Sequence, residues 1–258
     1  MSSADVLRPP LYLTPPSTPR IRAEMCVGRL GVIITPAQGN RIPDKGMVGV
    51  DNGVFTGHYP GDKAFLEWLR WLRDQFDIAR RCLFVAAPDV VGDAQATELL
   101  ARPMLEKIRN LGFPAALVAQ DHMERSTWDP WDEADCLFVG GSTAWKLSPA
   151  AANLCRVASS LWKHVHVGRV NSLRRYLHAA HVMEADSIDG TYLTYGPDKL
   201  LPVVLSWREK VLTSPALFGL EGLDPWDGGY LLTSPRPPAA APPLAHLHAQ
   251  LDLFDALS

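Results

Sequence analysis

The sequence has few cysteines and no recognisable pattern among them. Its four cysteines include no C-x-x-C pair: Cys26, Cys82, Cys136 and Cys155. Structural zinc sites commonly use such pairs, and disulfide-stapled secreted domains need a denser set, so both classes are disfavoured. We therefore expect no bound metal and no cofactor held by cysteine, with reduced thiols in the core of a cytoplasmic protein.

The chain also lacks a large excess of charge of either sign, and it lacks long apolar runs. The formal net charge is −3, from 25 Lys and Arg against 28 Asp and Glu. No global basic field therefore indicates a nucleic-acid partner, and any such site must be local. No apolar run is long enough to cross a bilayer, and the first residues lack a signal-peptide pattern. With 47% hydrophobic residues, the chain can build a sizeable core.

Proline marks the expected domain boundaries. Residues 1–20 contain five prolines and are interpreted as an extended leader, although Leu11-Tyr12-Leu13 is a candidate first strand. A Pro/Ala-rich stretch at residues 233–243 is interpreted as a stiff linker, followed by a separate terminal segment at 244–258. The catalytic domain is accordingly expected over residues 21–232.

Apolar strand candidates alternate with amphipathic helices through this domain. The expected helices span residues 21–30, 62–80, 94–111, 149–162, 170–183 and 198–212. The eight expected strands are 11–13, 31–35, 47–50, 82–87, 115–119, 136–139, 164–168 and a short strand around Ile188. Alternation predicts an α/β fold with a parallel sheet, and the number eight favours a (β/α)8 TIM-type barrel. A doubly wound sheet is the alternative, because the first units are weak and residues 39–46 are too short for a helix.

Five of these strands end on residues that could act in catalysis or in ligand binding. They are Asp51, Asp89, Gln120, the pair Gly140-Gly141, and Asp189. On a barrel, the carboxyl ends of all strands open onto one face. Two carboxylates can serve as a nucleophile and an acid/base partner. A third carboxylate and a primary amide can grip a purine edge, and a glycine pair lets the backbone approach a flat ligand.

The segment Ala185–Thr191 carries two of the chain's carboxylates. We expect Asp186 and Asp189 on one face of a short strand, with Gly190 allowing a sharp turn after them. Asp189 is the first choice for the nucleophile and Asp186 the second. The alternative is that either side chain merely caps the following turn.

The series of strand ends resembles one enzyme family, the tRNA-guanine transglycosylases, and more closely their relatives that insert deazapurines into DNA. Asp51-Asn52-Gly53-Val54-Phe55 is similar to the family's Asp-Ser-Gly-Gly-Phe motif. Asp89, Gln120 and Gly140-Gly141 resemble its base-gripping elements, and Asp186-Ser187-Ile188-Asp189 its nucleophile segment. The order along the chain agrees over roughly residues 31–200.

The resemblance implies a role for each residue. Asp189 would attack C1′ of the nucleotide, and Asp51 would protonate the departing guanine and deprotonate the incoming base, a free 7-deazaguanine such as preQ0. Asp89 would accept from the purine N1–H and amine, Gln120 would donate to its carbonyl, and Phe55 would stack on it. The alternatives are an Asx turn at Asp51, a helix N-cap at Asp89 and a core position for Phe55.

The chain also departs from the family. The tRNA enzymes carry a C-x-C-x-x-C plus His zinc site, and that spacing is absent here. This favours DNA over tRNA as the substrate. Three other functions remain open: a tRNA-guanine transglycosylase, a nucleoside hydrolase-type barrel, and a non-catalytic barrel that only binds nucleic acid.

Basic residues near the later strand ends are candidates for phosphate contacts. They are Lys146, Arg169, Arg174 and Arg175, with further charge from Lys163, His164 and His166. Arg169 directly follows a strand and is the best placed, whereas Arg174 and Arg175 equally fit a solvated helix face. A base stacked in a duplex cannot meet Asp189, so the target guanine must be flipped or single-stranded.

The last residues resemble a docking peptide. Gln250-Leu251-Asp252-Leu253-Phe254 is similar to the peptide by which bacterial replication and repair proteins bind the sliding clamp. Such a tether would concentrate the enzyme at newly replicated DNA. The alternative is a helix packed on the barrel, because Leu244, Leu247, Leu251 and Phe254 have helical spacing.

Overall fold

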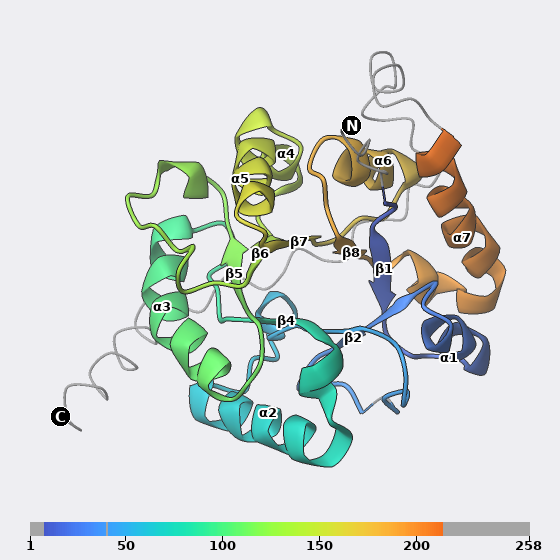
Figure 1. The fold of residues 1–258 in the computed structure, drawn as a ribbon, viewed down its shortest axis with the longest axis horizontal. Helices are drawn as coiled ribbons and strands as arrows, with labels where there is room; N and C mark the ends of the chain where they lie inside the picture. Colours follow the sequence, from blue (N-terminus) through green and yellow to red (C-terminus); the bar gives the residue numbers. More distant parts are fainter. Residues whose placement is uncertain (1–7, 40, 214–258) are drawn as a thin grey trace, which may run out of the picture. The chain divides into compact units, whose positions relative to one another are not determined.

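The computed structural model describes residues 8–39 and 41–213, which contain a closed barrel of eight parallel strands (Figure 1). The strands are β1 (Leu11–Thr14), β2 (Gly31–Ile34), β3 (Val48–Val50), β4 (Cys82–Ala86), β5 (Ala115–Ala119), β6 (Cys136–Val139), β7 (His164–Val167) and β8 (Ser187–Asp189). They follow sequence order, and β8 closes the ring by pairing with β1. The (β/α)8 prediction is confirmed, and the doubly wound alternative is excluded.

Helices lie around the outside of the strands (Figure 1). They are α1 (Pro19–Cys26), α2 (Asp62–Phe76), α3 (Ala94–Asn110), α4 (Thr143–Lys146), α5 (Pro149–Ser160), α6 (Leu173–His181) and α7 (Pro197–Thr213), with 3-10 turns η1 (Val54–Thr56), η2 (Ile78–Arg81), η3 (Met123–Arg125) and η4 (Tyr192–Tyr195). Side-chain caps fix several starts: Thr18 before α1 and Ser148 before α5 each accept a backbone N–H, with proline as the first helical residue. As predicted, the described residues of the connection from β2 to β3 form no α-helix.

The core has two layers. The barrel interior is filled by a small apolar cluster: Leu13, Ile33, Phe84, Ala86, Ala116, Val118, Cys136 and Phe138. A larger cluster lies between the strands and the helices. The interior is therefore a packed core and not a channel, so chemistry is confined to the barrel mouth. Polar side chains also lie in the interior: that of His166 is fully buried against the rings of Phe84 and Phe138, with 4.4 Å between centroids in each pair.

The structure corrects the expected N-terminal boundary. Residues 1–20 are not only a leader, because β1 begins at Leu11 and α1 at Pro19. The barrel domain thus begins before residue 21. The linker at 233–243 and the terminal segment at 244–258, with its docking motif Gln250–Phe254, lie outside the described residues. Among the helices of residues 8–213 that are described, none is long and apolar enough to cross a membrane.

Candidate active site

The strand-end residues come together at the mouth of the barrel. Gln120, directly after β5, donates from Nε2 to Oδ2 of Asp89 at 2.7 Å. Its Oε1 accepts from the backbone N–H of Gly141, after β6, at 3.0 Å, and from that of Gly92 at 2.9 Å. The amide thus joins the ends of three neighbouring strands, and one N–H of its Nε2 is not used in these bonds.

Asp89 is held from the other side by Asn52. The Nδ2 group of Asn52 donates to Oδ1 of Asp89 at 2.8 Å and to the carbonyl of Ala87 at 2.7 Å. Burial raises the pKa of Asp89 to about 6, against the lowering effect of the bonds from Asn52 and Gln120 and of the charge on Arg169. The N-cap of α3 is Asp93, so the capping alternative for Asp89 is wrong. No sequence signal distinguished Asn52 from an ordinary turn residue.

Asp51 is a carboxyl group that titrates near neutrality. Burial raises its pKa to about 7, and the negative charges of Asp189 and Asp89 raise it further, while the N–H of Gly53 opposes the shift. That N–H donates to Oδ1 of Asp51 at 2.6 Å, so the Asx turn is present. The turn and an acid/base role are compatible, because the turn engages one oxygen and fixes the carboxyl in the mouth.

Asp189, at the end of β8, has the opposite electrostatic environment. Its Oδ1 accepts from the backbone N–H of Arg169 at 3.0 Å, and its Oδ2 accepts from Nε2 of His166 at 3.0 Å. Burial alone would raise its pKa, but the bond and charge of His166, the Arg169 N–H and the charge of Lys146 outweigh it, and the pKa is lowered. Its side chain binds the neighbouring β7 loop and does not cap its own turn.

Asp186 does not share this site, and the expectation that both carboxylates lie on one face is wrong. Asp186 precedes β8, and its Oδ2 accepts from the N–H of Val165, near the start of β7, at 2.8 Å. It therefore lies at the opposite end of the barrel, which excludes it as a nucleophile. At Gly190, a Cβ would lie 2.4 Å from the carbonyl oxygen of Val170, so glycine there allows a close approach of two backbone segments.

Arg169 reaches across the mouth instead of outward toward solvent. Its guanidinium carbon lies 4.3 Å from the ring centroid of Phe55, on η1, and its Nη2 donates to the carbonyl of Gly141. The backbone of Arg169 is left-handed, with φ of 61°, which turns the side chain back over the barrel. Phe55 is 51% exposed, so the core alternative for it is wrong.

The remaining basic residues divide into two groups. Lys146 and Arg175 line a small cavity beside Arg169, and buried Lys146 donates to the carbonyl of Gly168 at 2.7 Å. Burial and the nearby charge of Arg169 lower the pKa of Lys146 to about 7. Arg174, which precedes Arg175 on α6, is not among the residues that line this cavity.

The expected contribution of Lys163, His164 and His166 to a phosphate site is wrong. Lys163 precedes β7, at the barrel end opposite the mouth. His166 is wholly buried, and burial lowers the pKa of His164 to about 3, so His164 carries no charge at neutral pH. The alternation of a strand turns both histidines into the barrel interior.

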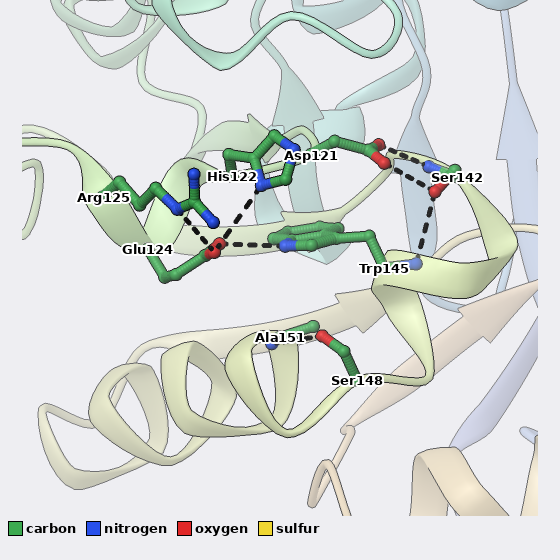
Figure 2. Close-up of polar contacts among 8 residues, drawn as sticks. All are labelled: Asp121, His122, Glu124, Arg125, Ser142, Trp145, Ser148 and Ala151. Carbon is green, nitrogen blue, oxygen red and sulfur yellow. Dashed lines mark hydrogen bonds and ion pairs between the residues drawn. The ribbon is translucent and has the colours of Figure 1, made fainter.

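A polar network supports the Gly140-Gly141 loop (Figure 2). Asp121 accepts from the backbone N–H of Ser142 at 2.6 Å and from its hydroxyl at 2.5 Å, and Ser142 caps α4. Trp145 of that helix donates from Nε1 to Glu124 at 2.9 Å. Gly141 has φ of 62°, and a Cβ there would lie 2.7 Å from both Asp121 and Trp145, so no other residue fits. Asp121 is thus a supporting residue that its sequence position did not reveal.

Within the described part of the chain, no group of three or more His, Cys, Asp or Glu side chains is placed to hold a metal ion. The polar groups of the mouth are instead engaged in hydrogen bonds with one another. The arrangement can supply an ionised carboxylate and a carboxyl that exchanges a proton near neutrality, beside a guanidinium stacked on an exposed aromatic ring.

Comparisons with known proteins extend to the fold alone. No protein-family model matches the chain, and no curated protein matches it. Among solved structures, the chain is similar to the BexX/CysO complex of Amycolatopsis orientalis, at 16% identity and TM-score 0.54 over 93% of this chain and 98% of that one. It is also similar to β-methylaspartase of Clostridium tetanomorphum, at 11% identity and TM-score 0.52 over 82% of this chain. The chain spans 60% of the length of that methylaspartase.

Proposed function

We propose that the protein is a DNA-guanine transglycosylase, an enzyme that exchanges guanine in DNA for a 7-deazaguanine base such as preQ0. The observation that carries the proposal is the pair of opposed pKa shifts at one barrel mouth. Asp189 is held ionised, as a nucleophile must be, while Asp51 has a pKa of about 7, as a proton donor and acceptor needs. Environments that separate two carboxyl pKa values in this way are typical of acid/base and nucleophile pairs.

In the first half of the reaction, a carboxylate oxygen of Asp189 attacks C1′ of the target nucleotide. The bond from C1′ to N9 breaks, and its electron pair passes to N9 of the departing guanine. Protonated Asp51 supplies the proton that guanine takes up. The product is a glycosyl ester on Asp189, with the phosphodiester chain intact.

In the second half, the incoming 7-deazaguanine loses its proton to ionised Asp51. Its nitrogen attacks C1′, and the ester bond breaks with return of the electron pair to Asp189. The two displacements give net retention at C1′. Protons balance over the cycle, because the proton lent to guanine is recovered from the incoming base, and no cofactor is consumed.

The placement of Arg169 supports a planar ligand with adjacent N–H groups. Its guanidinium stacks on Phe55, donates to Gly141 and lies close enough to Asp89 to lower the pKa of that carboxyl. The N1, C2 and exocyclic amine of guanine form the same planar N–C–N pattern of donors. The guanidinium therefore occupies the slot in which the resemblance places the base, and it must swing out when guanine enters.

A polynucleotide substrate is supported by the cations around this slot. Lys146, Arg169 and Arg175 gather on the side of the mouth next to Asp189. Displaced from the slot, Arg169 would be free to contact a phosphate of the flipped nucleotide. A hydrolase acting on free nucleosides needs no such cations, because its substrate has no phosphate beyond the base and sugar.

The test is incorporation of labelled guanine into nucleic acid. The protein is incubated with labelled guanine and, separately, single-stranded DNA, duplex DNA, tRNA or deoxyguanosine. Label is expected in guanine-containing DNA, and Asp189→Asn should abolish it, whereas Asp186→Asn, which keeps the acceptor to Val165 at the far end of the barrel, should not. Label in tRNA alone, or release of free base from deoxyguanosine, would contradict the proposal.

A further inference from the structure

A hydrogen-bonded chain of side chains runs through the barrel interior to Asp189. His164 Nε2 lies 2.7 Å from the hydroxyl of Ser187, and that hydroxyl lies 2.8 Å from Nδ1 of His166. The other ring nitrogen of His166, Nε2, lies 3.0 Å from Oδ2 of Asp189. Ser187 and His166 have no exposed surface.

The pairing of β7 with β8 produces this chain. His166 and Ser187 are partners in the ladder, so their side chains lie on the same face of the sheet. Strand alternation adds His164 and Asp189 to that face, which is the barrel interior. The ring of His166 packs against those of Phe84 and Phe138, with 4.4 Å between centroids in each pair, and these contacts restrict its rotation. Its two nitrogens are therefore fixed, one toward Ser187 and one toward Asp189.

Counting protons fixes the direction of the contact with Asp189. An ionised carboxylate only accepts, so Nε2 of His166 must carry a proton. If His166 is neutral, its Nδ1 accepts the Ser187 hydroxyl proton and His164 donates to the serine oxygen. If His166 is charged, Nδ1 donates to Ser187 and the hydroxyl donates to His164. Both arrangements satisfy every group in the chain, and in both the proton on Nε2 points at Asp189.

We propose that His166, held in place by Ser187 and His164, is a positioning residue for Asp189. This inference rests on the proposed function, because it assigns the role to the nucleophile of that reaction. The Arg169 N–H holds Oδ1 from the loop side, and His166 holds Oδ2 from the core side. Together they keep a buried carboxylate ionised and aim it at C1′.

The other groups that face Asp189 do not replace this contact. Lys146 of α4 and the side chain of Arg169 act on Asp189 through their charge. Tyr12 of β1 and Asp51 after β3 also interact electrostatically with Asp189. Among the described residues, only His166 and Arg169 donate a hydrogen bond to its carboxylate. Since burial favours the protonated carboxyl, loss of the His166 donor should raise the pKa of Asp189.

The test uses two substitutions of His166, each of which introduces a side-chain amide. His166→Gln places an N–H donor near the former Nε2, whereas the shorter His166→Asn places its amide near the former Nδ1 and leaves Asp189 without the bond. We expect His166→Asn to lower kcat by about 10- to 100-fold, the usual range for losing a bond to a charged group, with KM for DNA little changed. The acid limb of kcat should move to higher pH. His166→Gln should restore both within a few-fold.

A measurement without turnover separates this inference from the proposed function. In protein labelled with 13C at aspartate carboxyls, the titration midpoint of Asp189 should rise in His166→Asn and return in His166→Gln, whether or not guanine is exchanged. Ser187→Ala, which leaves His166 in place but frees its Nδ1, should give a smaller rise. Equal midpoints in the wild type and in folded His166→Asn, or equal losses of kcat in both amide variants, would overturn the positioning role.

Discussion

In the proposed guanine exchange, the pH dependence is expected to follow from two buried carboxyl groups. The pKa of Asp51 is about 7, and in the proposed mechanism Asp51 is protonated when guanine is expelled. The pKa of Asp89 is about 6, and in the proposed mechanism Asp89 is ionised when it accepts from the purine N–H groups. Asp189, with a lowered pKa, stays ionised over this range. The rate constant kcat/KM is therefore expected to be bell-shaped, with its maximum between about pH 6 and 7.

The fall of kcat/KM on each side of its maximum can be worked out from these pKa values. At pH 9, two pH units above the pKa of Asp51, about 1% of the enzyme carries the required proton, so kcat/KM should fall about 50-fold from its maximum. At pH 4, the same arithmetic for Asp89 gives a similar fall. The two groups interact, so the limbs report apparent values of the pair.

Initial rates of labelled-guanine incorporation into an oligonucleotide, measured from pH 4 to 9, give this profile. Asp51→Asn should slow exchange by about 10²- to 10⁴-fold and remove the alkaline limb, since the titrating acid is gone. A profile that stays flat from pH 6 to 9, or an alkaline limb that persists in Asp51→Asn, would refute the assignment of Asp51.

Three further predictions concern stability, the base slot and the tail. Because the folded-state pKa of Asp51 lies above the ordinary 3.8, ionising it disfavours the folded state, and its contribution to stability should fall as pH rises from about 4 to 7. Asp51→Asn should then unfold in urea with a free energy higher by up to about 4 kcal/mol at pH 8, with no gain at pH 4. Arg169→Ala should tighten binding of free guanine about 10-fold in calorimetry, because no guanidinium competes for Phe55; unchanged or weaker binding would contradict this. A labelled peptide of residues 245–258 should bind a bacterial sliding clamp in fluorescence polarisation and lose binding on Phe254→Ala; no binding would leave the packed helix as the alternative.

The barrel was predictable from the sequence because its evidence is local and repeated. Apolar strand runs, helical periodicity and stop signals recur along the chain, and β5, for example, spans the predicted residues 115–119. The strand-end rule likewise placed Asp51, Asp89, Gln120 and Asp189 at one mouth, since parallel strands in a barrel all end on the same face.

What could not be predicted depends on directions that the sequence does not encode locally. The inward turn of Arg169 depends on a left-handed backbone and on the position of Phe55, over a hundred residues earlier in the chain. His164 and His166 share a strand face, but whether that face is the interior is decided by the closure of the whole barrel. Asp186 and Asp189 lie close in sequence yet mark opposite ends of one strand, because three residues suffice for β8.

The central claim is that Asp189 forms a covalent bond to the sugar during base exchange. Mass spectrometry of the denatured protein, after incubation with a guanine-containing oligonucleotide and no incoming base, tests it directly. We predict an increase in mass equal to the oligonucleotide minus guanine, mapping to Asp189 on digestion and absent from Asp189→Asn. An adduct on another residue, or exchange of labelled guanine by Asp189→Asn at the wild-type rate, would contradict the account.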